Sequence, residues 1–344
     1  MSYPRRPLGN TTVSALGLGC LGFSAGYPSF GGYNDAESLA VLTRAADLGV
    51  IFWDTSDIYG PVTNERLIGK WFKETGRRGE IFLCSKFGYE IIDDKKASRV
   101  RGDPEYVRRA CEASLQRLGI DKIDLYYVHR IDKTVPIEST IKAMVELKNE
   151  GKIEYLGLSE CSARTLQRAH AVHPIAAIQI EFSPFALEIE SEEMPVLQTA
   201  RELGVKIVPY SPLGRGFLTN TIKSRNDIDP SDTRWTHPRF SEEHFPENLK
   251  LVATLSEIAR RKGVTPGQLV LAWVLAQGED FIPIPGTKKL RYLEENAAAA
   301  HVKLSGEEVA EIRREIEKAG GGKGARYPPA TLALTFGDSP ELEK

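Results

Sequence analysis

Apolar runs of strand length alternate with helical patterns along almost the whole chain, and this alternation limits the possible folds more than any other feature. We predict eight strands, at 15–20, 50–54, 80–86, 123–128, 153–159, 175–181, 205–210 and 281–285. Helical periodicity lies between and after them, near 35–48, 63–75, 104–118, 136–150, 162–171, 192–203, 248–262, 266–277 and 290–299. Strands that alternate with helices form a parallel sheet. Eight such units without a linker predict one closed (β/α)8 TIM barrel, an α/β fold, rather than two domains.

Further elements outside the repeating units complete this prediction. The Gly9-Asn10 turn between 5–8 and 11–15 predicts an N-terminal β-hairpin that closes the floor of the barrel. Extra helices are expected after the seventh and eighth strands, the last of them over 305–319. Three helix starts carry the pattern of a capping box: Asn34 with Glu37, Thr265 with Gln268, and Ser305 with Glu308.

The chain is interpreted as a single domain over 1–344, with its core at about 8–319. The remaining segment, 320–344, is expected to be a tail that is mobile at its end. Long loops follow three predicted strands, at 23–34, 87–102 and 212–247. In a barrel such loops lie at the carboxyl-terminal face, where functional sites are built.

The composition excludes several classes of partner. A formal net charge of −2 and a pI near 6.4 offer no positive excess for nucleic acid or an anionic membrane. The four cysteines form neither a CxxC pair nor a close cluster, so free thiols in a reducing compartment are expected. The segment MSYPRRPLGN has no apolar signal core, and no apolar run reaches the roughly 18 residues of a membrane span. We therefore expect a cytoplasmic protein.

One motif suggests a different nucleotide fold. Gly17, Gly19 and Gly22 match the GxGxxG pattern after a predicted strand. A Rossmann fingerprint requires the third glycine to open a helix, and it requires an acidic residue about 20 positions later. Here the chain continues into FSAGYPSFGGYN, which is too rich in glycine and proline for a helix. We interpret the motif as a glycine-rich strand end and reject the Rossmann fold.

Four reactive side chains lie at or just beyond the carboxyl ends of predicted strands. They are Asp54 and Tyr59 in WDTSDIYG, Lys86 in LCSKFG and His129 in LYYVHR. Taken singly, each is more readily explained as a turn, packing or solvated residue. Together they face the same rim of a barrel, which favours a shared chemical role.

The four groups have the chemistry needed to protonate a carbonyl oxygen. Tyr59 is the expected acid, since a phenol of pKa about 10 keeps its proton at neutral pH. The Lys86 ammonium is expected to lower that pKa, and Asp54 to pair with Lys86 and hold it charged. His129 is expected to bond either the phenol or the substrate oxygen. The set predicts a carbonyl reductase.

Seven motifs in fixed order resemble those of the aldo-keto reductase superfamily. They are WDTSDIYG, SKFG, YYVHR, GLSE, AIQIEFSP, PYSPLGRG and IPIPGT with LEEN, and the match around them runs from about Leu8 to Ala319. The resemblance is closest to the plant and fungal branch that includes pyridoxal reductase-like enzymes. It implies a (β/α)8 barrel that uses NADPH without a Rossmann motif to reduce aldehydes and ketones. The family's tetrad falls on Asp54, Tyr59, Lys86 and His129.

The same resemblance implies a set of contacts to NADP(H). Tyr210 would stack on the nicotinamide, and Gln179 would hold its carboxamide together with the Ser159-Glu160 pair. Three residues after the seventh strand would border the pyrophosphate, with Arg215 also able to pair with a phosphate: Ser211, Leu213 and Arg215. The segment near the eighth strand would take the adenosine 2′-phosphate and the adenine: Gly286, Thr287, Lys288, Glu295 and Asn296.

Two positions depart from the pattern that many members share. Glu160 stands where an asparagine is common, and a carboxylate can accept from the carboxamide but cannot donate to it; pairing with a cation is the alternative. Tyr292 stands where some members place an arginine on the 2′-phosphate, which shifts that role to Lys288. Lys288, Lys289 and Arg291 favour NADPH over NADH, although a solvated basic helix end has the same composition.

The substrate and the physiological role stay open at this level. Aromatic residues on the long loops suit an apolar carbonyl compound, but packing against the barrel explains each of them equally well: Phe23, Tyr27, Phe30, Phe87, Tyr89, Phe217, Trp235 and Phe240. A regulatory subunit that binds the cofactor is an alternative function for the same fold. Alcohol oxidation in the reverse direction is another, because the same groups serve both directions.

Overall fold

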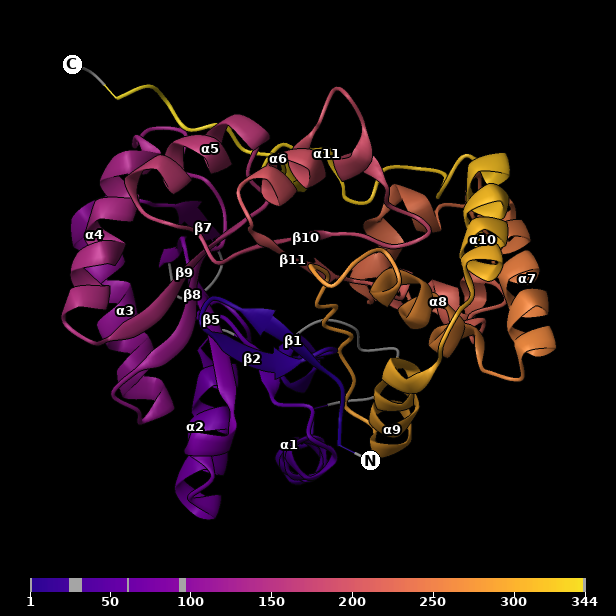
Figure 1. Cartoon of the computed structure of the whole chain (residues 1–344), viewed down its shortest axis with the longest axis horizontal. Helices are drawn as coiled ribbons and strands as arrows, with labels where there is room; N and C mark the ends of the chain where they lie inside the picture. Colours follow the sequence, from indigo (N-terminus) through magenta and orange to yellow (C-terminus); the bar gives the residue numbers. More distant parts are fainter. Residues whose placement is uncertain (1, 25–32, 61, 93–96, 343–344) are drawn as a thin grey trace.

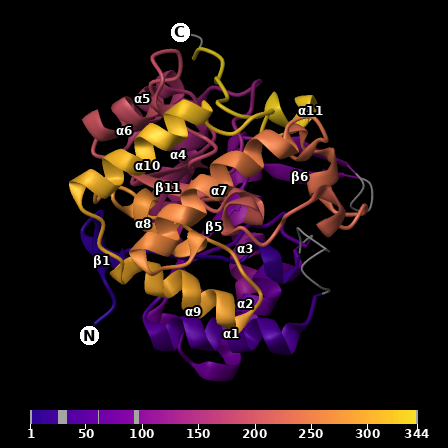
Figure 2. The same ribbon diagram turned by 90° about the vertical axis from the view of Figure 1, so that its right-hand side faces the viewer.

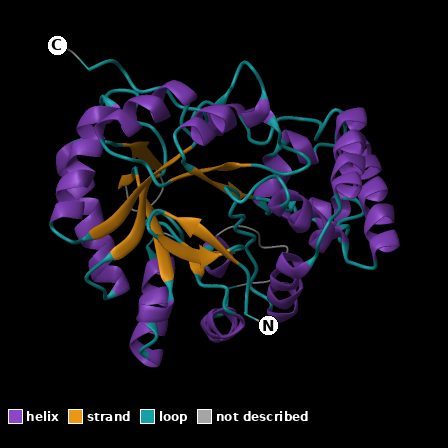
Figure 3. Cartoon of the chain, viewed as in Figure 1, coloured by secondary structure: helices purple, strands orange, loops and turns teal. Residues whose placement is uncertain are grey.

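A parallel sheet at the centre of the molecule is surrounded by helices (Figures 1 and 3). The structure, a computed structural model, describes residues 2–24, 33–60, 62–92 and 97–342. Seven strands pair in chain order. They are β3 (Leu18–Gly19), β4 (Phe52–Asp54), β5 (Phe82–Phe87), β8 (Ile123–Val128), β9 (Ile153–Ser159), β10 (Ala177–Glu181) and β11 (Lys206–Tyr210).

The eighth predicted strand closes the barrel through hydrogen bonds on both sides. Ile282 N donates to Ile207 O at 2.8 Å, toward β11, and on the other side Gly17 N donates to Pro283 O at 2.9 Å. Pro283 and Pro285 have no N–H, so this segment cannot return hydrogen bonds toward β3. On the β3 side the pairing is therefore reduced to an isolated bridge at Gly286, and on the β11 side an isolated bridge lies at Phe281. The predicted (β/α)8 barrel is confirmed, with seven regular strands and one extended closing segment.

Helices cover the outside of this sheet. The barrel helices are α1 (Asp35–Leu48), α2 (Thr63–Thr75), α3 (Pro104–Leu118), α4 (Ile137–Asn149), α5 (Ala163–Val172), α6 (Val196–Glu202), α8 (Pro266–Leu275) and α9 (Leu290–Ala298). Three more lie outside the repeat: α7 (Phe245–Lys262), α10 (Gly306–Ala319) and α11 (Pro329–Leu332). Helix α7 packs against α8 and α10 (Figure 2). Reciprocal capping boxes are present at Thr265 and Ser305, and the Asn34 side chain accepts from Glu37 N.

Two separate apolar layers hold these elements together. The inner one fills the barrel and includes Phe52, Leu125 and Val208, whereas the outer one lies between the strands and the helices. The hairpin of β1 (Arg5–Leu8) and β2 (Thr11–Ser14) adds Leu8 and Val13 to the inner layer. It therefore closes the barrel floor as predicted.

The glycine motif near the N-terminus serves strand packing. A Cβ on Gly17 would lie 2.6 Å from Phe52 O, and one on Gly19 would lie 2.8 Å from Ile284 O. Both distances are too short for any side chain, so glycine is required where β3 approaches its two neighbours. The residues that follow form a short 3-10 helix, Leu21–Phe23, and no α-helix begins among the described residues 20–24.

Two segments expected as loop or tail have more structure than the sequence suggested. The loop over 87–102 contains an antiparallel hairpin, β6 (Tyr89–Ile92) with β7 (Ala97–Val100). The C-terminal segment lies against α5, where Ser162 N donates to Gly337 O at 3.0 Å (Figure 1). Within the described ranges, no helix is both long and apolar enough to cross a membrane.

Candidate active site

The side chains that point into the barrel change from apolar to reactive toward the carboxyl end of each strand. On β5 the inner row passes from Cys84 to Lys86, and on β8 it passes from Tyr127 to His129. Asp54 ends the corresponding row on β4. Side chains alternate between the two faces of a strand, so residues two apart share one face. This periodicity brings Asp54, Lys86 and His129 to the same rim, and Tyr59 lies in the turn that follows β4.

Lys86 is the centre of the site. Its Nζ donates to Asp54 Oδ1 at 2.5 Å, to the Thr55 carbonyl at 2.8 Å and to Tyr59 Oη at 3.1 Å. An ammonium has three N–H donors, so these three acceptors use all of them. Tyr59 Oη accepts in this arrangement, and the phenol's own hydrogen is left to point elsewhere.

The charges of this group follow from burial and pairing. Burial by itself lowers the pKa of Lys86, but Asp54 and Tyr59 outweigh it and raise that pKa above its ordinary value. We expected Lys86 to lower the pKa of Tyr59. Lys86 does lower it, but burial of the phenol raises the pKa by more and Asp54 raises it further, so the net pKa of Tyr59 lies above its ordinary value. Tyr59 is therefore protonated at neutral pH.

His129 lies beside the phenol and is kept neutral. Its ring meets that of Tyr59 edge-on, with centroids 5.9 Å apart. Burial lowers the pKa of His129 well below its usual range, and the cations of Arg130 and Lys86 lower it further. His129 Nδ1 lies 3.1 Å from Ser56 Oγ, which itself lies 3.1 Å from Asp57 Oδ1.

Asp57 is a buried carboxyl group behind this histidine. Burial raises its pKa to about 8, with a further rise from Glu65, against the opposing effects of Ser56 and Arg117. The group is therefore largely protonated at neutral pH. Ser56 and Asp57 both lie within WDTSDIYG, but the sequence alone assigned them no role.

Two predicted cofactor residues are held by the tetrad and its neighbours. Gln179, on β10, donates from Nε2 to Asp54 Oδ2 at 2.7 Å. Tyr210, at the end of β11, donates from Oη to Glu160 Oε1 at 2.8 Å and keeps a half-buried ring. Ser159, at the end of β9, is buried beside them.

Glu160 pairs with an arginine that the sequence did not single out. Arg326 binds its carboxylate in bidentate fashion, at 2.8 and 2.7 Å. Burial alone raises the pKa of Glu160, but Arg326, Arg130 and Tyr210 outweigh it, so the carboxylate is charged. The pairing with a cation, left open above, is therefore what the structure shows. No sequence pattern marked Arg326, because its position depends on how the C-terminal segment docks.

Arg215 makes a similar buried pair. Its two Nη atoms lie 3.2 and 2.8 Å from the Glu181 carboxylate, and Arg239 approaches the same group at 3.5 Å. The expected pairing of Arg215 with a phosphate therefore competes with Glu181. The loop after β11 runs from Ser211 through Leu213 to Arg215, with φ of 49° at Ser211 and 55° at Arg215.

The segment after the closing strand carries the remaining cofactor candidates. Lys288 is buried, and its Nζ lies 5.3 Å from the centroid of the Tyr33 ring. Glu295 accepts from Thr265 Oγ1 at 2.6 Å, and Asn296 is buried beside it on α9. Gly286 and Thr287 precede Lys288 directly, and both keep some exposure.

The aromatic residues of the loops divide into two groups. Four of them are buried in the outer apolar layer and serve packing: Phe23, Phe87, Phe217 and Phe240. Tyr89 instead meets the His129 ring edge-on, with centroids 5.2 Å apart. The Trp235 ring stacks on the guanidinium of Arg225, with 3.8 Å between the ring centroid and Arg225 Cζ. Tyr27 and Phe30 lie outside the described residues.

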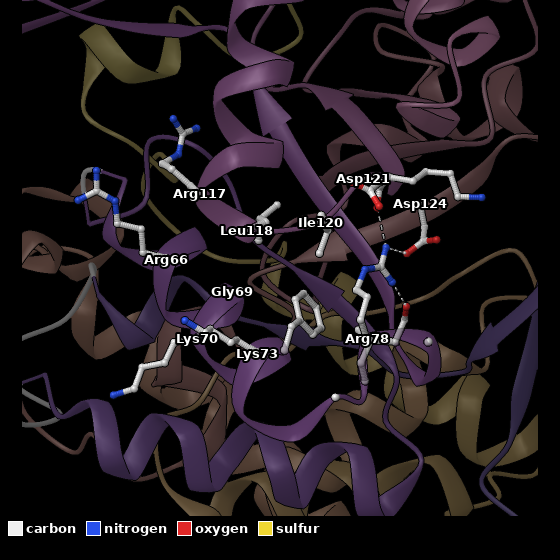
Figure 4. Close-up of a pocket in the computed structure, with 16 residues that line it drawn as sticks. Arg66, Gly69, Lys70, Lys73, Arg78, Arg117, Leu118, Ile120, Asp121 and Asp124 are labelled. Atoms are coloured by element: carbon white, nitrogen blue, oxygen red, sulfur yellow. Dashed lines mark hydrogen bonds and ion pairs between the residues drawn. The ribbon is translucent and has the colours of Figure 1, made fainter.

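A groove of about 900 Å³ lies at the opposite end of the barrel, between the C-terminal parts of α2 and α3 (Figure 4). Several of the side chains that line the groove are basic. Two of them are paired with carboxylates: Arg78 with Asp124 at 2.7 Å and Arg117 with Glu65 at 2.6 Å. The groove shares no residue with the tetrad. Among the described residues, no cluster of His, Cys, Asp or Glu side chains is arranged to hold a metal ion.

Comparison with known proteins identifies relatives along the whole chain. A profile of the Aldo/keto reductase family matches residues 15–317. The NADP(+) aldo-keto reductase yakc of Schizosaccharomyces pombe is 51% identical over 344 residues, covering 100% of both chains. Aldo-keto reductase str7 of Strobilurus tenacellus is 51% identical over 347 residues, covering 99% of each chain.

A solved structure supports the fold. The glycerol dehydrogenase AKR11B4 from Gluconobacter oxydans superposes with a TM-score of 0.84 at 24% identity, covering 93% of this chain and 97% of its own. At this identity the likeness concerns the barrel alone.

Proposed function

This chain belongs to the aldo/keto reductase family, and we propose that it reduces an aldehyde or ketone to the alcohol, with NADPH as the hydride donor and Tyr59 as the proton donor. The NADP(+) in the name of a relative that is 51% identical supports the choice of cofactor. The hydrogen bonds around Lys86 support the choice of acid.

The chain offers a donor set that fits a nicotinamide dinucleotide. Tyr210 presents a half-buried ring at the end of β11, and Gln179 carries an amide beside Asp54. The buried cation of Lys288 suits the adenosine 2′-phosphate, the group that NADPH carries and NADH lacks. A bound NADPH supplies the hydride that reduces the carbonyl carbon.

The protein's own groups manage the proton. Lys86 saturates its donors on Asp54, Thr55 and Tyr59, so the Tyr59 hydrogen is available to the substrate oxygen. As negative charge develops on that oxygen, the phenol donates its proton, and the adjacent ammonium stabilises the phenolate that remains. Asp54 holds the ammonium in place through the whole step.

His129 orients the same oxygen. The Ser56 hydroxyl lies within hydrogen-bond distance of both Asp57 Oδ1 and His129 Nδ1, and it can turn its one hydrogen from the carboxyl group to Nδ1. The imidazole hydrogen then sits on Nε2, the nitrogen that is free to donate to the carbonyl oxygen. Two donors, a phenol and an imidazole, thus converge on one acceptor.

The observation that carries this proposal is the position of Lys86 between Asp54 and Tyr59. The test is the loss of NADPH absorbance with 4-nitrobenzaldehyde, for the protein and for Tyr59→Phe. We expect turnover to fall by about 10²- to 10⁴-fold in the variant. Tyr155→Phe, on the barrel floor, is the matched control and should keep its turnover. Equal rates for the protein and Tyr59→Phe would refute the role of the phenol.

A further inference from the structure

The arginine that follows the tetrad histidine is buried without a carboxylate partner. Arg130 is 6% exposed, and Nη1 donates to the carbonyl of His129 at 2.7 Å. Its Nε is enclosed and has no hydrogen-bond partner. Among the described residues, no acceptor lies on Nη2 and no ion pair involves Arg130. Burial of a guanidinium in this state costs free energy of desolvation unless a ligand supplies the missing hydrogen-bond acceptors.

The neighbouring cations differ from Arg130 in this respect. Lys86 is paired with Asp54 at 2.5 Å and Arg326 with Glu160 at 2.7 Å. Arg215 and Arg239 share Glu181. Within the part of the chain described, Asp54, Glu160 and Glu181 are each in a direct ion pair with one of these four cations, and Arg130 has no direct ion pair.

The surroundings of Arg130 place it at the reacting end of the site. Its charge acts on Tyr59 and on His129, where it lowers the pKa of both side chains. Arg130 also interacts electrostatically with the Glu160 carboxylate and with the side chains of Tyr210 and Tyr89. The two rings come from the end of β11 and from β6, and both are half-buried.

We propose that Arg130 binds an anionic oxygen group on the substrate, so that this protein acts preferentially on carbonyl compounds that also carry a carboxylate or a phosphate. The inference rests on the proposed function, since it names the substrate class of the same site. An anionic group would supply the missing acceptor at Nη2, in a charge-assisted hydrogen bond that the low-dielectric surroundings strengthen.

The test compares each formylbenzoate isomer with its methyl ester. These pairs share the aldehyde and the ring and differ in the charge. We expect the protein to favour at least one acid over its ester in kcat/KM, and Arg130→Met to reduce that preference by about 10- to 100-fold. Arg130→Lys, which keeps a positive charge but loses the planar pair of N–H donors, should retain part of the preference for the acid. Arg99→Met, which removes an exposed arginine on β7, should leave the preference unchanged.

Two further arms separate the possible outcomes. 4-Formylphenyl phosphate, compared with 4-hydroxybenzaldehyde, shows whether phosphate is preferred to carboxylate. Binding of benzoate to the NADP+-loaded protein, followed by fluorescence, reports on Arg130 without turnover. If no aldehyde is reduced but Arg130→Met loses benzoate, the proposed reaction fails and the anion site stands. Equal acid and ester rates in the unaltered protein, or a preference and benzoate affinity that Arg130→Met and Arg130→Lys leave unchanged, would overturn the inference.

Discussion

Replacing Asp57 by asparagine should change how stability depends on pH. Asp57 is 7% exposed, and its pKa in the folded protein is about 8, raised first by burial and then by Glu65. In the unfolded chain an aspartate has a pKa of about 3.9. At pH values between about 4 and 8, Asp57 therefore holds about one more proton in the folded protein than it does in the unfolded chain. Asp57 therefore makes the free energy of unfolding fall as pH rises through this window.

The size of the effect follows from that difference in proton binding. One bound proton corresponds to about 1.4 kcal/mol per pH unit. Stability linked to Asp57 is fully present below about pH 4 and is lost as pH rises toward about 8. The asparagine side chain of the variant does not titrate. The free energy of unfolding of the variant, relative to that of the parent, should therefore rise by about 2.7 kcal/mol between pH 5 and pH 7.

The assay is equilibrium unfolding in urea at pH 5, 6 and 7, followed by tryptophan fluorescence. At each pH, the free energy of unfolding of the parent is subtracted from that of Asp57→Asn. The contributions of the other titrating groups, which the two proteins share, then cancel. Asp121→Asn, at an exposed position, is the control and should give a flat difference. A flat difference for Asp57→Asn as well would refute the argument that this carboxyl is neutral in the folded protein.

Three further substitutions test the site. Lys86→Met should reduce turnover by about 10²- to 10⁴-fold, because the phenolate loses its cation; stopped-flow rates within tenfold of the parent would contradict this. Lys288→Ala should weaken NADPH by roughly tenfold and NADH much less in fluorescence titrations, and equal weakening would exclude a contact to the 2′-phosphate. Arg326→Gln should cost about 3–5 kcal/mol of unfolding free energy, since Glu160 stays buried and charged. Adding Glu160→Gln should recover part of that loss, and a double variant as unstable as the single one would argue against the pair.

Much of the fold could be predicted because its signals are local. Alternating strand and helix patterns are visible in short windows, and a parallel sheet with eight units has few ways to close. The tetrad could be predicted for a related reason. Asp54, Lys86 and His129 lie on inward rows near strand ends, so the barrel places them together once it forms.

Other features required the whole structure. Pro283 and Pro285 weaken the pairing of the closing segment, although its apolar pattern is that of a strand. The hairpin β6–β7 was missed because a long polar loop and a short two-stranded ribbon look alike in sequence. The pKa of Tyr59 was predicted from its cation alone, and burial proved to be the larger effect.

The sequence by itself determined the barrel, the identity of the reactive groups and the strand ends on which they lie, because each depends on periodicity within a few residues. Only the tertiary structure decided which charges meet. Arg326 reaches Glu160 across 166 positions of the chain, and among the described residues Arg130 has no direct ion pair although its neighbours are paired. Such pairings depend on distances between segments far apart in sequence, and on burial, which sets how strongly each charge is felt.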